Sequence, residues 1–146
     1  MLTLREFLVV LAVVIVYGGI RLLPRLLTGR DAWVSPAQVR LEMDDDDAPL
    51  LLDVRSPAEY AGRPGHIRGA VNLPLPLLKS RLSDGSFRRE YPAPVIVAVC
   101  RSDARAAISV RMLKKAGFNG PRAMSGGMSA WEEEGYPVVT GLDANV

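Results

Sequence analysis

The chain has 146 residues, of which 49% are hydrophobic and 23% are charged, with a formal net charge of +2. These values fit one globular domain with a short appendage and argue against a second full domain. The small charge, scattered without interleaved aromatic residues, argues against a nucleic-acid partner. Because Cys100 is the single cysteine, an internal disulfide, a CxxC pair and a multi-cysteine metal site are excluded, and a reducing compartment is favoured.

The first segment of the chain is strongly apolar. Residues 7–20 carry no charge, and leucines extend the apolar surface over residues 2–23. A helix that crosses the hydrocarbon core needs about 20 residues, and Arg5 and Arg21 can reach the headgroups from its ends. A signal peptide would have a basic start and a clear small-residue cleavage site. We therefore predict one hydrophobic helix that anchors the protein as a single-pass membrane protein.

The charges around this segment predict its orientation. Positive residues follow it at Arg21, Arg25 and Arg30, whereas Glu6 neighbours Arg5 before it. Loops rich in Lys and Arg stay on the cytoplasmic side. We expect an anchor and basic linker over residues 1–29 and a folded domain over residues 30–146 that faces the cytoplasm, with a membrane-protein partner left open.

The rest of the chain alternates short apolar runs with helical patterns. This alternation predicts an α/β fold, with a mostly parallel central sheet and helices on both faces. The first predicted elements are a helix over 35–41, a strand over 50–54, a helix opening at Ser56 with a capping box to Glu59, a strand over 70–72, the segment 74–82 and a loop over 83–86. The remaining elements are a strand over 95–99, a helix over 104–116 ended by Gly117, a strand over 122–124, and a helix around 131–134.

Cys100 stands where the central strand meets a polar turn and the next helix. Backbone N–H groups at a helix start, with Arg101 and Arg105 beside them, favour an anion at the turn and predict a lowered thiol pKa. A lone cysteine after a valine run is also typical of a buried core position. Two arginines so close would be costly to bury without partners, which favours an open, reactive thiol.

Four motifs in sequence resemble those of a single-domain rhodanese, a sulfurtransferase, over about residues 33–138. The residues that carry the resemblance are, in chain order, Asp53-Val54-Arg55 with Glu59-Tyr60, Gly65-His66-Ile67-Arg68-Gly69-Ala70 with Asn72-Leu73-Pro74, Cys100-Arg101 through Arg105, and Gly126-Gly127-Met128-Ser129-Ala130-Trp131 with Gly135-Tyr136-Pro137-Val138. The hydrophobic first segment lies outside the similarity.

The resemblance implies that Cys100 takes a sulfane sulfur from a small donor, which is thiosulfate or another persulfide or sulfane source. Cys100 then holds the sulfur as a persulfide and passes it to a thiol or cyanide-like acceptor. It implies no metal or organic cofactor. The loop that would bind the substrate is Cys100, Arg101, Ser102, Asp103, Ala104 and Arg105. Asp53 and Arg55 are expected to orient the loops through charge-assisted hydrogen bonds.

The loop departs from the family pattern at two positions. Asp103 stands where rhodaneses often carry glycine, and Ala106 where a hydroxyl residue is common. Asp tolerates left-handed backbone angles, so the loop geometry can survive. A carboxylate near the thiol should raise the cysteine pKa and repel thiosulfate, unless it turns outward or pairs with Arg101 or Arg105. We therefore expect weak activity with thiosulfate, and another physiological donor is left open.

Other activities and sites have competing interpretations. Related phosphatases have five residues between cysteine and arginine, whereas here there are four, so the cradle suits sulfur better than phosphate. A scaffold that keeps the fold without turnover and a redox-sensing thiol remain open. His66 is predicted to be structural rather than a catalytic base, Trp131 to be core rather than a substrate platform, and the acidic run 44–47 to be a solvated connection rather than a calcium loop.

Overall fold

The computed structural model describes residues 3–92 and 95–142. Five parallel strands form one sheet in the order β1-β5-β4-β2-β3. The strands are β1 (Trp33–Val34), β2 (Leu50–Asp53), β3 (Val71–Asn72), β4 (Ile96–Val99) and β5 (Arg122–Met124). The predicted α/β fold with a parallel sheet is confirmed. β4 lies at the centre, and all four of its residues are buried, as its unbroken apolar run requires.

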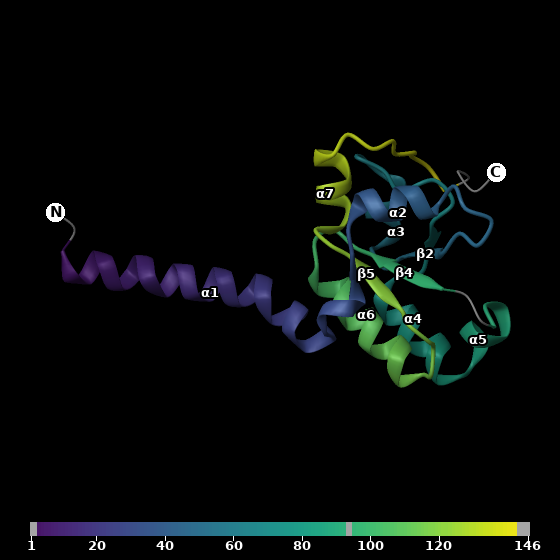
Figure 1. The fold of residues 1–146 in the computed structure, drawn as a ribbon, viewed down its shortest axis with the longest axis horizontal. Coiled ribbons are helices and arrows are strands. Elements are labelled where there is room, and N and C mark those ends of the chain that lie inside the picture. Colours follow the sequence, from purple (N-terminus) through teal and green to yellow (C-terminus); the bar gives the residue numbers. More distant parts are fainter. Residues whose placement is uncertain (1–2, 93–94, 143–146) are drawn as a thin grey trace.

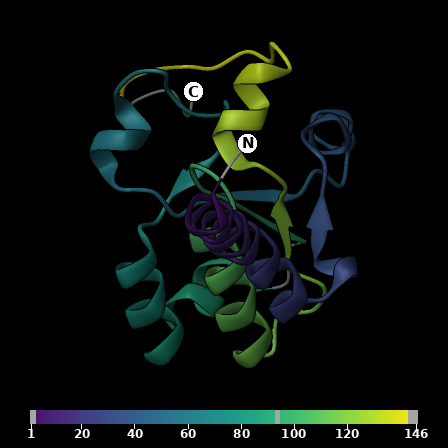
Figure 2. The same cartoon turned by 90° about the vertical axis from the view of Figure 1, so that its left-hand side faces the viewer.

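Helices cover both faces of the sheet (Figure 1). They are α2 (Pro36–Glu42), α3 (Pro57–Ala61), α4 (Leu75–Ser83), α5 (Ser86–Glu90), α6 (Ala104–Lys115) and α7 (Gly127–Glu133). One core cluster joins the sheet to α4, α5 and α6 through residues such as Leu78, Phe87 and Val110. The other joins it to α2, α3 and α7 through Val39, Tyr60 and Trp131. Figure 2 shows these two helical layers on opposite sides of the strands.

Most predicted elements are present with bounds shifted by a residue or more. The strand over 95–99 is confirmed as β4, and the helix over 104–116 as α6. The capping box from Ser56 to Glu59 opens α3 as predicted, since each side chain bonds the other residue's backbone N–H. The structure adds β1 and α5, which the sequence analysis does not predict. The predicted loop over 83–86 contains Gly85, whose positive φ allows α5 to begin at once.

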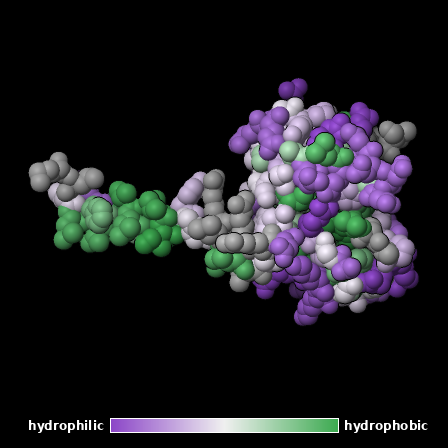
Figure 3. All heavy atoms as spheres, viewed as in Figure 1, coloured by the Kyte–Doolittle hydropathy of each residue, from purple (hydrophilic) through white to green (hydrophobic). Residues whose placement is uncertain are grey.

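The apolar first segment forms the helix α1 (Leu4–Thr28), with Thr3 and Glu6 as its capping box. Its apolar side chains are exposed, for example Val13 at 59% and Ile15 at 63% (Figure 3). Across residues 3–92 and 95–142, no helix has a stretch long and apolar enough to cross a bilayer. The structure therefore does not support the predicted transmembrane span over residues 2–23.

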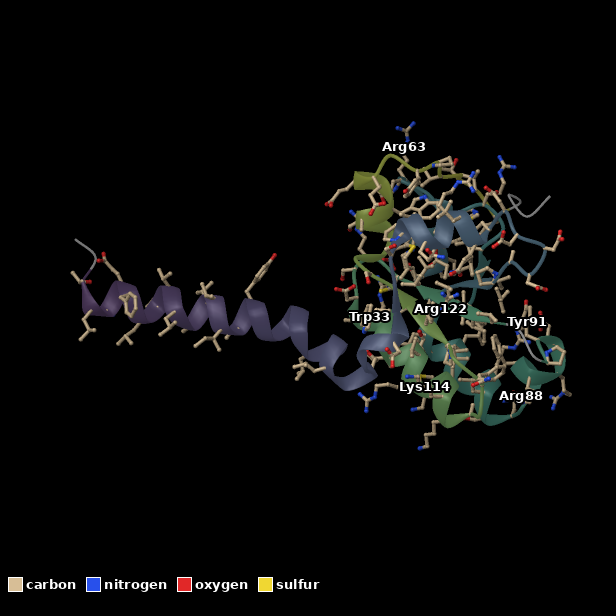
Figure 4. All side chains as sticks on the ribbon, in the orientation of Figure 1. Trp33, Arg63, Arg88, Tyr91, Lys114 and Arg122 are labelled. Carbon is tan, nitrogen blue, oxygen red and sulfur yellow. The ribbon has the colours of Figure 1, made fainter. Side chains whose placement is uncertain are left out.

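The C-terminal end of α1 packs against α6. Lys114 on α6 donates a hydrogen bond from Nζ to the Thr28 carbonyl at 3.1 Å. The indole Nε1 of Trp33 donates to Oγ1 of Thr28 at 2.8 Å, and a short 3-10 helix, η1 (Arg30–Ala32), joins α1 to β1. Figure 4 shows Trp33 and Lys114 beside the end of α1. The helix is thus fastened to the domain by its last turn.

Candidate active site

Cys100 lies at the carboxyl end of the central strand β4, directly before the loop that opens α6. Its side chain is buried, with 1% of the residue exposed. The backbone N–H of Ala106 donates to Sγ of Cys100 at 3.3 Å, and the N–H groups of Ser102 and Arg105 also favour its thiolate form. The strand-to-helix turn therefore wraps its amides around the sulfur, as an anion site requires.

The thiol pKa nevertheless moves in the opposite direction from the sequence prediction. Burial raises the pKa of Cys100 above its ordinary value and outweighs the lowering by the loop amides and by the charge of Arg105. The prediction of a lowered thiol pKa is wrong for this structure, although Arg101, Ser102 and Ala104 of the loop are exposed as an open turn requires. The physical reason is desolvation, because a thiolate at a closed strand end loses more water than the loop dipoles replace.

The two arginines of the loop are already paired with carboxylates. Arg105 makes a two-pronged pair with Glu59 of α3, from Nη1 to Oε2 at 2.8 Å and from Nη2 to Oε1 at 2.7 Å. Arg101 is more exposed and lies 3.7 Å from Glu132 of α7, measured from Nη1 to Oε1. The guanidinium group of Arg105 is therefore held by α3, whereas Arg101 makes only a longer ion contact with α7.

Glu59 is a site residue that the sequence analysis places only in a helix cap. Its carboxylate serves both the backbone and hydroxyl of Ser56 and the guanidinium of Arg105. The bonds from Arg105, followed by those from Ser56, lower the pKa of Glu59 to about 2. A capping box uses only some of the hydrogen bonds that the Glu59 carboxylate can accept. Nothing in the sequence indicates that Arg105, 46 residues away, donates the others.

Asp103 makes a contact that the sequence analysis does not predict. Its Oδ1 accepts the backbone N–H of Gly126 at 2.7 Å, so the carboxylate bonds the turn before α7. Its φ is −128°, and no non-glycine residue of the described chain has a positive φ, so left-handed tolerance is not needed. Asp103 therefore links the Cys100 loop to the turn that starts α7.

The first residues of α7 bond the same loop through their backbone. The N–H of Met128 donates to the Cys100 carbonyl at 2.8 Å, and that of Ser129 donates to the Arg101 carbonyl at 3.1 Å. A Cβ on Gly127 would lie 2.3 Å from the Cys100 carbonyl oxygen, and the φ of Gly127 is +56°. The close approach of α7 to the loop thus requires glycine. The sequence shows this glycine but does not show what it contacts.

Asp53 and Arg55 form a fully buried pair below the loops. Nη2 of Arg55 donates to Oδ2 of Asp53 at 2.7 Å and to the Gly65 carbonyl at 2.9 Å. The side chain of Asn72 adds bonds to the carbonyls of both Asp53 and Arg55. These charge-assisted bonds tie the end of β2 to the 62–66 loop and to β3, and the orienting role of the pair stays a prediction.

His66 is fully buried and held by backbone. Its Nδ1 lies 2.8 Å from the Tyr60 carbonyl, its ring stacks on that of Tyr60 at 3.5 Å between centroids, and its backbone bonds Val139. Within the described chain, its Nε2 has no hydrogen-bond partner. These contacts favour the structural interpretation, and its role stays a prediction.

The remaining predicted residues lie on or outside the loop. Ser102 and Ala104 are exposed at the mouth of the loop. Trp131 is 1% exposed and donates from Nε1 to the Pro137 carbonyl, as a core residue would. The acidic run 44–47 is an exposed turn, and over the described residues no group of three His, Cys, Asp or Glu side chains is placed to hold a metal ion.

The family model of the rhodanese-like domain matches residues 35–134. The chain belongs to this family. Its rhodanese-like domain is 35% identical over 95 residues to a sulfurtransferase of Allochromatium vinosum, with 65% of this chain and 82% of that protein covered.

Two further relatives show the extent of the likeness. An uncharacterized protein of Synechocystis is 32% identical over 119 residues, which cover 82% of this chain and 62% of that protein. The solved structure of a human single-domain sulfurtransferase matches with a TM-score of 0.59 and 28% identity, over 70% of this chain and 96% of that one. The chain thus spans only part of its first curated relative but nearly all of a single-domain one.

Proposed function

We propose that this rhodanese-like protein is a sulfurtransferase that carries sulfane sulfur on Cys100. The observation that carries the proposal is the convergence of the Ser102, Arg105 and Ala106 amides on Sγ of Cys100. The family assignment and relatives named sulfurtransferases support sulfur transfer in general. Asp53, Arg55 and His66 support the loop from below, and the reaction asks for no metal or organic cofactor.

The reaction has two steps through one covalent intermediate. The Cys100 thiol first gives its proton to solvent, and the thiolate attacks the outer sulfur of the donor. The sulfur–sulfur bond of the donor breaks, and its remainder leaves with the bonding electron pair. A thiol or cyanide-like acceptor then attacks the outer sulfur of the Cys100 persulfide and regenerates the thiolate. The loop amides stabilise the anionic sulfur in both steps.

Intact mass after incubation with a sulfane-sulfur donor tests the proposal. We expect the chain to gain one sulfur atom and to lose it again on addition of cyanide. Cys100→Ser should gain none. Because burial raises the pKa of Cys100, the rate of sulfur uptake should keep rising with pH above the ordinary thiol range near 9. A chain that gains no sulfur at any pH contradicts the proposal.

A second candidate is a binding module without turnover, which the burial of the thiol favours. Cys100 is 1% exposed and its pKa is raised. In the resting protein its sulfur is therefore shielded from water, as the sulfur of a core cysteine is. The same observation disfavours a redox sensor, because such thiols are exposed and have low pKa values. Failure of both sulfur uptake and alkylation of Cys100 would support the binding module.

We further propose that α1 associates with a membrane, with the rhodanese-like domain on the cytoplasmic side. The apolar side chains exposed along α1 and the arginines after residue 20 support this placement. A thiol reagent that does not cross membranes tests the side. Because Cys100 is buried, the reporter should be Glu133→Cys in a Cys100→Ser background, since Glu133 is exposed. Labelling in intact cells would reverse the proposed topology.

A further inference from the structure

A small groove lies at the end of the domain away from Cys100. The residues that line it are Leu82, Gly85, Arg88, Arg89, Ala116 and Phe118. In the chain α5 precedes β4 and Phe118 precedes β5, whereas Cys100 follows the carboxyl end of β4. Because the strands are parallel, the groove and Cys100 lie at opposite ends of the strands (Figure 1).

The floor of this groove is apolar and small. Phe118 belongs to the core cluster under α4, α5 and α6, and Leu82 packs against that cluster. The groove has a volume of about 200 Å³. Pockets that enclose a whole small-molecule ligand measure about 300 to 1,000 Å³. The groove therefore has room for one bulky apolar side chain rather than for a complete cofactor or metabolite.

Two guanidinium groups border this floor, and neutral groups hold both of them. Arg88 donates from Nη2 to the Ala116 carbonyl at 2.8 Å, and its Cζ lies 4.1 Å from the centroid of the Phe118 ring. Arg89 donates from Nη1 to the Asp84 carbonyl at 3.2 Å. Over residues 3–92 and 95–142, neither guanidinium lies within ion-pair distance of a carboxylate oxygen. Both positive charges are therefore positioned at the groove and available to an anion.

The elements around the groove carry an excess of positive charge. From the start of α4 to the end of α5, and over the end of α6, the cations are Lys79, Arg81, Arg88, Arg89, Arg111, Lys114 and Lys115. The carboxylates of the same stretches are Asp84 and Glu90, and Glu90 is already paired with Arg81. A surface with such an excess attracts acidic groups.

We infer that this groove is a docking site for an acidic segment of a partner protein. One bulky apolar side chain of the segment packs on Leu82 and Phe118. Carboxylates on either side of it pair with Arg88 and Arg89, since a guanidinium group binds a carboxylate with two parallel hydrogen bonds. A lipid surface fits less well, because α5 lies on the side of the domain away from α1 (Figure 1). The inference goes beyond sulfur transfer, because a partner docked here leaves the Cys100 loop uncovered.

Fluorescence anisotropy of a labelled peptide with the full chain tests the inference. The probe is a short peptide in which glutamates flank one phenylalanine, and a second peptide has glycine in place of the phenylalanine. Arg88→Gln combined with Arg89→Gln should raise the Kd of the probe at least about tenfold, because interface arginines contribute strongly to binding. The glycine peptide should bind the wild type about tenfold more weakly, since it buries no apolar side chain. Added salt should raise the Kd of the probe.

A matched control separates the groove from the overall charge of the protein. Arg63→Gln combined with Arg68→Gln also removes two exposed arginines, and Figure 4 shows Arg63 at the end of the domain opposite Arg88. This control should leave the Kd unchanged. If the Arg88 and Arg89 variant does not fold by circular dichroism, Arg89→Gln alone gives the same test with a smaller expected effect.

Three results would overturn the docking site. They are no binding of the probe to the wild type, equal weakening by the two pairs of substitutions, and equal Kd values for the two peptides. A single-stranded oligonucleotide of the same charge that binds as tightly as the probe would also overturn it. Each of these results concerns binding alone, so the mass test of sulfur uptake on Cys100 can succeed or fail independently.

Discussion

The Cys100 loop and helix α1 are stabilised in opposite ways. Polar groups of the loop find partners far along the chain, such as Gly126 for Asp103 and Glu59 for Arg105, which lie 23 and 46 residues away. α1 satisfies its own backbone, closes its first turn with a capping box from Thr3 to Glu6, and exposes its apolar side chains. The conformation of the loop therefore depends on the folded domain, whereas the environment of the exposed apolar side chains of α1 is not supplied by the domain.

The largest expected effect comes from breaking the buried pair that supports the loops. Arg55→Met leaves Asp53 as a buried carboxylate without its guanidinium and should lower the free energy of unfolding by about 3 to 5 kcal/mol. Arg40→Met is the matched control, because its partner Asp44 is exposed, and it should cost less than about 1 kcal/mol. Chemical denaturation of both variants measures the difference. Equal losses would mean that the buried pair stabilises nothing specific.

The next effect compares two glycines with positive φ, one where α7 contacts the loop and one that faces open space. Gly127→Ala and Gly120→Ala both place a side chain at a positive φ, +56° and +57°, which costs about 1 to 3 kcal/mol in each. Only the Cβ at Gly127 meets the Cys100 carbonyl, at 2.3 Å, whereas nothing lies within 4 Å of the one at Gly120. We expect sulfur uptake to fall at least about tenfold in Gly127→Ala alone. Similar uptake in the two variants would argue against the close contact.

A smaller effect, visible mainly in acid, comes from Glu59. Its folded pKa of about 2 lies below the ordinary value of 4.5, so its contribution is complete above pH 4.5 and is lost as the pH falls toward 2. The wild type should therefore be more stable than Glu59→Gln at neutral pH, and the difference should shrink over that window. Urea denaturation at several pH values measures it, with Glu133→Gln as an exposed control. A pH-independent difference would contradict the pairing.

The smallest effect on the domain is expected from α1. Val13 is 59% exposed, so Val13→Asp should change the free energy of unfolding of the domain by less than about 0.5 kcal/mol. The same change should abolish flotation of the full chain with phospholipid vesicles, because it places a charge on the apolar surface. Leu41→Asp, an exposed apolar position on α2, should leave flotation unchanged. Flotation of all three proteins alike would argue against membrane association through α1.

The sequence predicts best those parts whose causes are local. The apolar run before Cys100 predicts β4, and the capping box at Ser56 and Glu59 predicts the start of α3. Both patterns lie within a few residues of the chain. β1 and β3 each have only two residues, too few to show alternation, and the sequence analysis identifies β3 but not β1. α5 escapes prediction because a helix of five residues carries no helical period.

The sequence by itself determined that one thiol stands at a strand-to-helix turn with arginines beside it, because that placement follows from the order of residues. Only the tertiary structure decided how that turn behaves. In the folded chain the thiol is buried, Arg105 is paired with Glu59, and Arg101 lies near Glu132. Asp103 accepts a hydrogen bond from the turn before α7. The reason is that desolvation and charge pairing depend on distances between segments, and these distances are set by how the helices pack on the sheet.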